Sequence, residues 1–155
     1  MESLMKYISR TSRCANLFRG DKVEGLGGYQ HIYILKICKH PGISQEQLAQ
    51  MIYINKSNVT RQLSMLEQNG YITRKPCEKD RRIMEVYPTK KALEIYPQVQ
   101  RISKDWNNGL IAEFSEEEQA LLLSMMERVM NRAIARLEQD AKERSEKEWE
   151  KSSNI

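Results

Sequence analysis

Long apolar runs are absent from this sequence of 155 residues. No stretch approaches the roughly 20 residues that a membrane-spanning helix needs, so we expect no transmembrane segment and no membrane partner. The first six residues lack the basic flank and the apolar core of a secretion signal. These two absences predict a protein that stays in the cytoplasm.

Metal ligands and disulfide partners are also scarce. The three cysteines, Cys14, Cys38 and Cys77, are odd in number and far apart, which favours neither a disulfide framework nor a CxxC metal pair. Only two histidines are present, so a histidine-rich metal site is not expected. The sequence contains no recognisable Gly-rich phosphate loop and no nucleophile–base pairing, and we expect neither a cofactor nor an enzyme.

Charge, by contrast, is abundant and unevenly distributed. The chain is 30% charged and 40% hydrophobic, with a formal net charge of +4. Residues 54–91 contain nine Lys or Arg against four Asp or Glu, whereas residues 138–151 contain four basic and six acidic residues. Positive charge that gathers in one part of a chain is the expected footprint of phosphate binding.

Apolar residues recur at helical spacing over most of the chain. The segments with this pattern are approximately 4–19, 29–39, 44–52, 55–68, 89–110 and 115–137. Ser44 and Gln47 have the spacing of a capping box, which predicts a helix start at Ser44. Pro97 lies inside the fifth segment, where it is expected to kink or break the helix. We therefore predict six helices.

The hydrophobic period changes between the fourth and fifth segments. Residues 71–75 are rich in β-branched and aromatic types, residues 76–80 are polar, and residues 83–87 alternate apolar with polar. This pattern predicts two strands around a charged loop, which is a β-hairpin wing. The predicted fold class is mainly α with a small β-hairpin wing, a winged helix-turn-helix.

The third and fourth helices carry the first candidate site. Two helices joined by a short turn present the second helix to the DNA major groove. Val59, Leu63 and Leu66 of that helix face the core by their spacing. The opposite face and the preceding helix start supply candidate DNA-binding residues, namely Ser44, Lys56, Ser57, Asn58, Thr60, Arg61 and Gln62. An ordinary solvated helix face is the alternative interpretation.

The wing carries the second candidate site. Its candidate DNA-binding residues are Arg74, Lys75, Lys79, Asp80, Arg81 and Arg82. A hairpin tip is narrow enough to enter the minor groove, whose negative potential attracts Arg. Asp80 and Arg82 are two positions apart, so Asp80 can hold the guanidinium of Arg82 in place. A charged loop that only keeps the protein soluble is the alternative.

Four segments also carry a family resemblance. They are HPGISQEQLA at 40–49, NKSNVTR at 55–61, LEQNGYI at 66–72 and DRR at 80–82. Through them the sequence resembles the MarR family of bacterial regulators over about residues 6–137. The resemblance implies a triangular homodimer with interleaved first and last helices. It also implies a pseudo-palindromic operator on double-stranded DNA, frequent repression, and release by small, often phenolic, effectors.

These expectations divide the chain into three parts. We expect a dimerisation helix and linker at 1–28, a winged helix-turn-helix domain at 29–88, and dimerisation helices at 89–155. A cleft between the DNA-binding part and the dimer helices would suit a small aromatic effector. Its candidate lining residues are Tyr29, Tyr33 and Trp106.

Other functions stay open from the sequence. The chain would be a redox-responsive regulator if Lys75, Lys79 and Arg81 lowered the pKa of the Cys77 thiol. It would be a helical interaction protein if the basic segment never met nucleic acid. An enzyme that uses a winged helix only to dimerise is disfavoured, because only two predicted helices follow residue 88.

Overall fold

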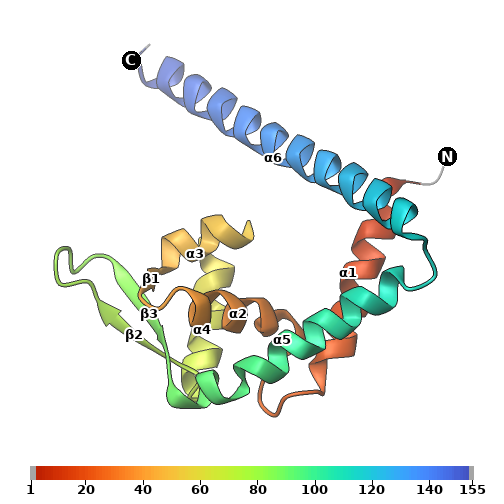
Figure 1. The fold of residues 1–155 in the computed structure, drawn as a ribbon. Coiled ribbons are helices and arrows are strands. Elements are labelled where there is room, and N and C mark those ends of the chain that lie inside the picture. Colours follow the sequence, from red (N-terminus) through yellow and green to blue (C-terminus); the bar gives the residue numbers. More distant parts are fainter. Residues whose placement is uncertain (1–2, 154–155) are drawn as a thin grey trace. The chain divides into compact units, whose positions relative to one another are not determined.

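The computed structural model describes the backbone of residues 3–153 and the side chains up to residue 146. Six α-helices and one 3-10 turn, η1, make up most of this part of the chain (Figure 1). They are α1 (Leu4–Gly20), η1 (Gly28–Gln30), α2 (His31–Lys39), α3 (Gln45–Ile52), α4 (Lys56–Gln68), α5 (Lys90–Ile111) and α6 (Glu116–Ser153). The predicted helix count and the mainly α class are confirmed. None of these helices has the length and apolar content needed to cross a bilayer.

The chain divides into two compact units, one up to Asn108 and one from Gly109 onward. The first unit contains a three-stranded antiparallel sheet in the order β1-β3-β2, formed by β1 (Ile43–Ser44), β2 (Ile72–Pro76) and β3 (Met84–Pro88). Strands β2 and β3 are the two arms of the predicted wing. Strand β1 was not predicted, because two residues are too few to show an alternating pattern.

The core of the first unit lies where α2, α3 and α4 meet the sheet. Its fully buried side chains include Ile34, Ile37, Leu48, Leu63 and Val86. Burying one such aliphatic side chain stabilises a fold by about 1.5–3 kcal/mol. This packing holds the two helices of the helix-turn-helix against the base of the wing.

Local sequence signals set the ends of α3 and α4. The predicted capping box is present, since Ser44 Oγ accepts a hydrogen bond from Gln47 N and Gln47 Oε1 accepts one from Ser44 N, both at 3.0 Å. Tyr53 ends α3 in the left-handed conformation, with φ of 53°. Asn55 then caps α4 by accepting from Asn58 N at 2.8 Å. The turn between the helices is therefore short and fixed at both ends.

Helix α5 does not break at Pro97. It is one helix from Lys90 to Ile111, with Pro97 inside it. The proline is exposed, whereas Ala92, Val99 and Ile102 are buried on either side of it. Packing on both sides offsets the hydrogen bond that a proline removes from a helix.

Helix α6 is longer than the apolar spacing predicted. Its start is capped as expected, since Glu118 N donates to Ser115 Oγ at 3.3 Å and Ser115 N donates to Glu118 Oε2 at 2.8 Å. Beyond Leu137 the helix continues through a polar segment to Ser153. Ala, Glu, Lys and Arg in that segment are good helix formers, so it needs no apolar stripe to remain helical.

Candidate nucleic-acid interface

Helix α4 presents its first two turns to solvent on the predicted face. Val59, Leu63 and Leu66 are buried, as the spacing predicted. The candidate contact residues lie on the other sides of the helix. Of these, Lys56, Ser57, Thr60 and Arg61 are exposed, and Asn58 and Gln62 are half-buried.

Several of these side chains already have protein partners. Arg61 Nη2 donates to Asn58 Oδ1 at 3.3 Å, and Thr60 Oγ1 donates to the Lys56 carbonyl at 2.9 Å. Thr60 therefore offers its hydroxyl oxygen mainly as an acceptor. The first two turns of α4 show a mixed set of donors and acceptors of the kind that meets base edges and phosphates.

Gln62 faces a different neighbour, the short η1 turn. Its Oε1 accepts from Gln30 Nε2 at 3.2 Å, and Gln30 is only 3% exposed. Gln30 Oε1 in turn accepts from Gly27 N at 2.9 Å. The bond between Gln62 and Gln30 joins α4 to the turn that precedes α2. Gln62 therefore borders the predicted surface and also links α4 to α2.

Lys56 lies in an ion pair that the sequence pattern did not reveal. Its Nζ is 2.7 Å from Glu46 Oε1, and both side chains are largely exposed. The hydrogen bond from Lys56, and then its charge, lower the pKa of Glu46. Glu46 lies two residues after Ser44, so α3 places an acid beside the first basic residue of α4.

The wing tip contains the pair that the sequence predicted. Arg82 Nε donates to Asp80 Oδ1 at 3.0 Å, and Arg82 Nη2 lies 2.9 Å from Asp80 Oδ2. Hydrogen bonds from the Arg82 side chain and backbone lower the pKa of Asp80. The Arg82 side chain is nevertheless 91% exposed. The guanidinium is thus oriented and still open to a partner, with Lys75, Lys79 and Arg81 exposed nearby in sequence.

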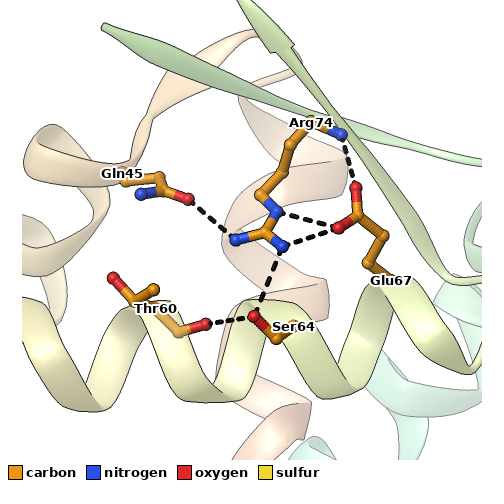
Figure 2. A network of polar contacts seen from close by, with 5 residues as sticks. All are labelled: Gln45, Thr60, Ser64, Glu67 and Arg74. Carbon is orange, nitrogen blue, oxygen red and sulfur yellow. Dashed lines mark hydrogen bonds and ion pairs between the residues drawn. The ribbon is translucent and has the colours of Figure 1, made fainter. Parts of the chain in front are cut away.

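Arg74 was predicted to belong to the same surface, and the structure places it elsewhere. Its side chain is 19% exposed, and its guanidinium bonds to Glu67, Gln45 and Ser64 (Figure 2). Side chains alternate along a strand, so Arg74 of β2 shares the inward face of Ile72. That alternation was visible in the sequence and separates Arg74 from the outward Lys75.

A hollow joins helix α4 to the wing within the first unit. It has a volume of about 250 Å³. Its lining residues are Ser44, Gln45, Glu46, Lys56, Thr60, Arg82, Ile83 and Met84. Lys56 and Thr60 of α4 therefore border the same concave surface as Arg82 of the wing. Two candidate sites that lie more than twenty residues apart in sequence form one surface.

The three candidate effector residues have different surroundings. Tyr29 is 59% exposed, whereas Tyr33 is only 1% exposed in the core. Trp106 is half-buried against Phe18, with ring centroids 4.9 Å apart. Tyr33 is therefore a core residue rather than an accessible lining residue, because its neighbours in the sheet-and-helix core cover it. Burial raises its pKa, and the charge of Arg61 opposes that shift.

His31 lies fully buried at the start of α2. Neither of its ring nitrogens makes a well-formed hydrogen bond within the described residues. Burial, and then the charge of Arg19, lower the pKa of His31 to about 4, and the nearby Arg19 backbone only partly offsets this. His31 is therefore a neutral core residue at pH 7.

Cys77 has an acidic neighbour as its hydrogen-bond partner. The carboxylate of Glu85 accepts from Tyr87 Oη at 2.8 Å. It also accepts from the Cys77 thiol, and these two bonds lower the pKa of Glu85, Tyr87 more than Cys77. The thiol therefore faces a carboxylate as well as the basic residues on which the redox hypothesis depended.

Comparisons with known proteins point in one direction. The sequence profile of the MarR family matches residues 30–84. A helix-turn-helix transcriptional regulator of Bacillus subtilis (strain 168), YybA, is 31% identical over 100 residues, which are 64% of this chain and 67% of the relative.

Solved structures of MarR-family regulators also resemble this chain. A MarR transcriptional regulator from Methanosarcina mazei Go1 has a TM-score of 0.76 at 27% identity, over 83% of this chain and 94% of its own. A MarR-family regulator from Listeria monocytogenes, crystallised as a complex with a 26mer DNA, has a TM-score of 0.77 at 25% identity. That match covers 85% of this chain and 89% of the Listeria chain.

Proposed function

Since the chain belongs to the MarR family of DNA-binding transcription regulators, which are not enzymes, we propose that it binds a pseudo-palindromic operator as a homodimer. Repression in the cytoplasm, relieved by a small effector, is the proposed output. The observation that carries the proposal is the hollow that brings Lys56 and Thr60 of α4 beside Arg82 of the wing. One concave surface with a basic residue from each element, Lys56 of α4 and Arg82 of the wing, can then meet a groove and its flanking phosphates together.

Helix α4 is proposed to read base edges in the major groove. Its contact residues in this proposal are Lys56, Ser57, Asn58, Thr60, Arg61 and Gln62, with Ser44 at the start of α3 touching the backbone. Arg and Asn are the side chains best suited to bidentate recognition of guanine and adenine. Arg61 is exposed and Asn58 is its neighbour at 3.3 Å, so the two form the centre of the proposed reading surface.

The wing is proposed to bind the adjacent minor groove and phosphates. Lys75, Lys79, Arg81 and Arg82 supply the positive charge, and Asp80 orients Arg82. Insertion of an oriented Arg responds to groove width and potential more than to base identity. The Listeria relative was crystallised with a 26mer DNA, and duplex DNA is the partner that we propose here.

The dimer is proposed because apolar side chains remain exposed on the terminal helices. On α1 these include Leu4, Met5 and Leu17, and on α6 they include Leu121, Met125, Met126, Met130 and Leu137. Apolar surface of this extent on neighbouring turns usually marks an interface. A second copy of the chain is the proposed cover, and its two-fold symmetry would match a palindromic site.

The proposed effector is a small aromatic molecule. It would act only if it bound more tightly to one arrangement of the two reading helices than to the other. Tyr29 and Trp106 are retained as candidate contacts, since both are at least partly accessible.

Selection of binding sites from random duplex DNA with the purified full chain tests the proposed function. We expect enriched inverted repeats whose half-sites are about one helical turn apart. Binding to random duplex should weaken steeply with salt, as phosphate contacts require. A protein that binds no duplex at low salt would contradict the proposal and favour a helical interaction protein.

A further inference from the structure

The polar network around Arg74 connects three elements of the first unit. From β2, Arg74 Nε and Nη2 lie 3.0 and 2.6 Å from Glu67 Oε2 on α4. Its Nη1 donates to Gln45 Oε1 at the start of α3, at 3.3 Å. The Arg74 backbone N donates to the second Glu67 oxygen at 3.1 Å. One arginine therefore joins the wing to both helices of the helix-turn-helix (Figure 2).

The network also reaches the reading face of α4. Arg74 Nη2 lies 3.3 Å from Ser64 Oγ, and Ser64 Oγ donates to the Thr60 carbonyl at 3.0 Å. Thr60 and Arg61 lie on the turn that borders the proposed groove contact. Figure 2 shows Ser64 on α4 between Thr60 and the guanidinium of Arg74.

The polar network around Arg74 fixes the orientation of α4, which apolar packing alone does not fix. Val59, Leu63 and Leu66 hold α4 against the core, but hydrophobic contacts have no preferred direction. Arg74 Nε and Nη2 both donate to Glu67 Oε2, and the Arg74 backbone N donates to Oε1. These three charge-assisted bonds constrain both distance and angle between the two residues. They restrict rotation and sliding of α4 relative to β2. Contacts to base edges need side chains placed within about 0.5 Å, so this restriction bears directly on sequence reading.

Arg74 has little capacity left for DNA. Each of its three side-chain nitrogens has a protein acceptor, and the side chain is 19% exposed. Arg74 and Glu67 together carry no net charge. The pair therefore adds nothing to phosphate attraction, although each residue alone would change it.

We propose that Arg74 and Glu67 are positioning residues that set the operator specificity of α4 without touching DNA. The inference rests on the proposed function, because specificity has meaning only if α4 reads an operator. It assigns the pair a role distinct from that of Lys75, whose side chain leaves the opposite face of β2.

Three variants separate positioning from simple charge. They are Arg74→Gln, Glu67→Gln and the double variant, whose net charge equals that of the wild type. Affinities are measured by fluorescence anisotropy, at several salt concentrations, for a duplex selected by the wild-type protein and for a random duplex of equal length. Circular dichroism shows whether each variant folds.

Positioning predicts that the double variant binds random duplex like the wild type, with the same salt slope. Its preference for the selected duplex should fall by about tenfold, the equivalent of roughly one good base contact. Each single variant should show a similar fall in preference, since residues of one network are not additive. Lys75→Gln is the matched control: it should weaken binding to both duplexes alike and reduce the salt slope.

Charge alone predicts a different pattern. Arg74→Gln would then weaken binding to both duplexes alike, Glu67→Gln would strengthen it, and the double variant would bind both duplexes with the wild-type affinity and an unchanged preference. That outcome, or a salt slope lowered by about two per dimer in Arg74→Gln, would overturn the inference. If Arg74→Gln does not fold, the double variant and Ser64→Ala are measured instead. A fall in preference for the selected duplex, with unchanged binding to random duplex, supports positioning, and an unchanged preference overturns it. Failure of the proposed function is distinct, because the wild-type protein would then show no preference between duplexes.

Discussion

Asp80 holds Arg82 from two residues away, with Nη2 2.9 Å from Oδ2, while the Arg82 side chain stays 91% exposed. An exposed ion pair of this kind adds little to fold stability. The pair instead fixes the orientation of the Arg82 guanidinium, because Asp80 holds one side of it and the other side remains open to solvent. The wing thus carries an arginine whose direction is already set in the free protein.

Asp80→Ala should weaken DNA binding even though it removes a negative charge. Without the carboxylate the guanidinium of Arg82 samples many directions, and ordering it again costs free energy on binding.

Arg82→Ala should lower affinity for selected and random duplexes alike. It should also reduce the salt slope by about one for each phosphate that Arg82 neutralises per protomer. Titration of labelled duplex at two salt concentrations measures both effects. Tighter binding by Asp80→Ala would leave only a general basic patch.

Glu46→Gln should strengthen DNA binding. Glu46 holds Lys56 at 2.7 Å beside the hollow between α4 and the wing. Removing its charge releases Lys56 and removes repulsion from phosphates, so affinity should rise a few-fold for selected and random duplexes. Thermal stability should hardly change, because the pair is exposed. Unchanged binding would place the Glu46–Lys56 pair away from the DNA surface, and weaker binding would show that Glu46 is itself needed there.

The folded chain should become less stable as pH falls, because His31 titrates. The pKa of His31 is lowered to about 4 in the folded chain, below the value of about 6.5 in an unfolded chain. The unfolded state therefore binds more protons between these values, and the contribution is lost as pH falls from about 6.5 towards 4. Between pH 7.5 and 5 the loss should be about 2 kcal/mol, on the order of 1.4 kcal/mol for each pH unit below 6.5. Urea unfolding of the wild type and of His31→Phe at pH 7.5 and 5 measures it. Equal pH dependence in both would assign the effect to other groups.

Val129→Glu should disrupt the proposed dimer. Val129 lies on α6, within the stretch that carries exposed Met126 and Met130. A carboxylate in an apolar interface loses its hydration without gaining a partner. Because the terminal helices have no other cover in this proposal, dissociation and unfolding should occur together. Arg128→Glu is a control at the neighbouring, exposed position. A folded monomer of the wild type in sedimentation would contradict the dimer.

Local relationships were predictable from the sequence. The Ser44–Gln47 capping box and the Asp80–Arg82 pair each join residues two or three positions apart, so spacing alone determines which side chains can meet. The amphipathic pattern of α4 likewise placed Val59 and Leu63 inward. In each case the backbone period sets the geometry and tertiary packing only preserves it.

Contacts between residues far apart in the sequence were not predictable from the sequence. The bond between Gln30 and Gln62 joins positions 32 apart, and the bond between Arg74 and Gln45 joins positions 29 apart. Polar side chains of these types are usually exposed, and nothing in a single sequence shows which of them will be covered by another element. Arg74 was misplaced for this reason, although the alternation from Ile72 indicated its side. Tyr33 was misplaced because an aromatic residue suits a ligand pocket and a core equally well.

The effect of Arg61→Ala on binding to the selected duplex tests whether α4 reads the operator. Arg61 is exposed on α4, and its guanidinium donates to Asn58 on the same helix. If α4 reads the operator, the variant should bind the selected duplex at least about tenfold more weakly, in the range of one base-specific arginine contact. Its melting temperature should match that of the wild type. A fall in melting temperature with unchanged affinity for the selected duplex would contradict the account and give Arg61 a structural role.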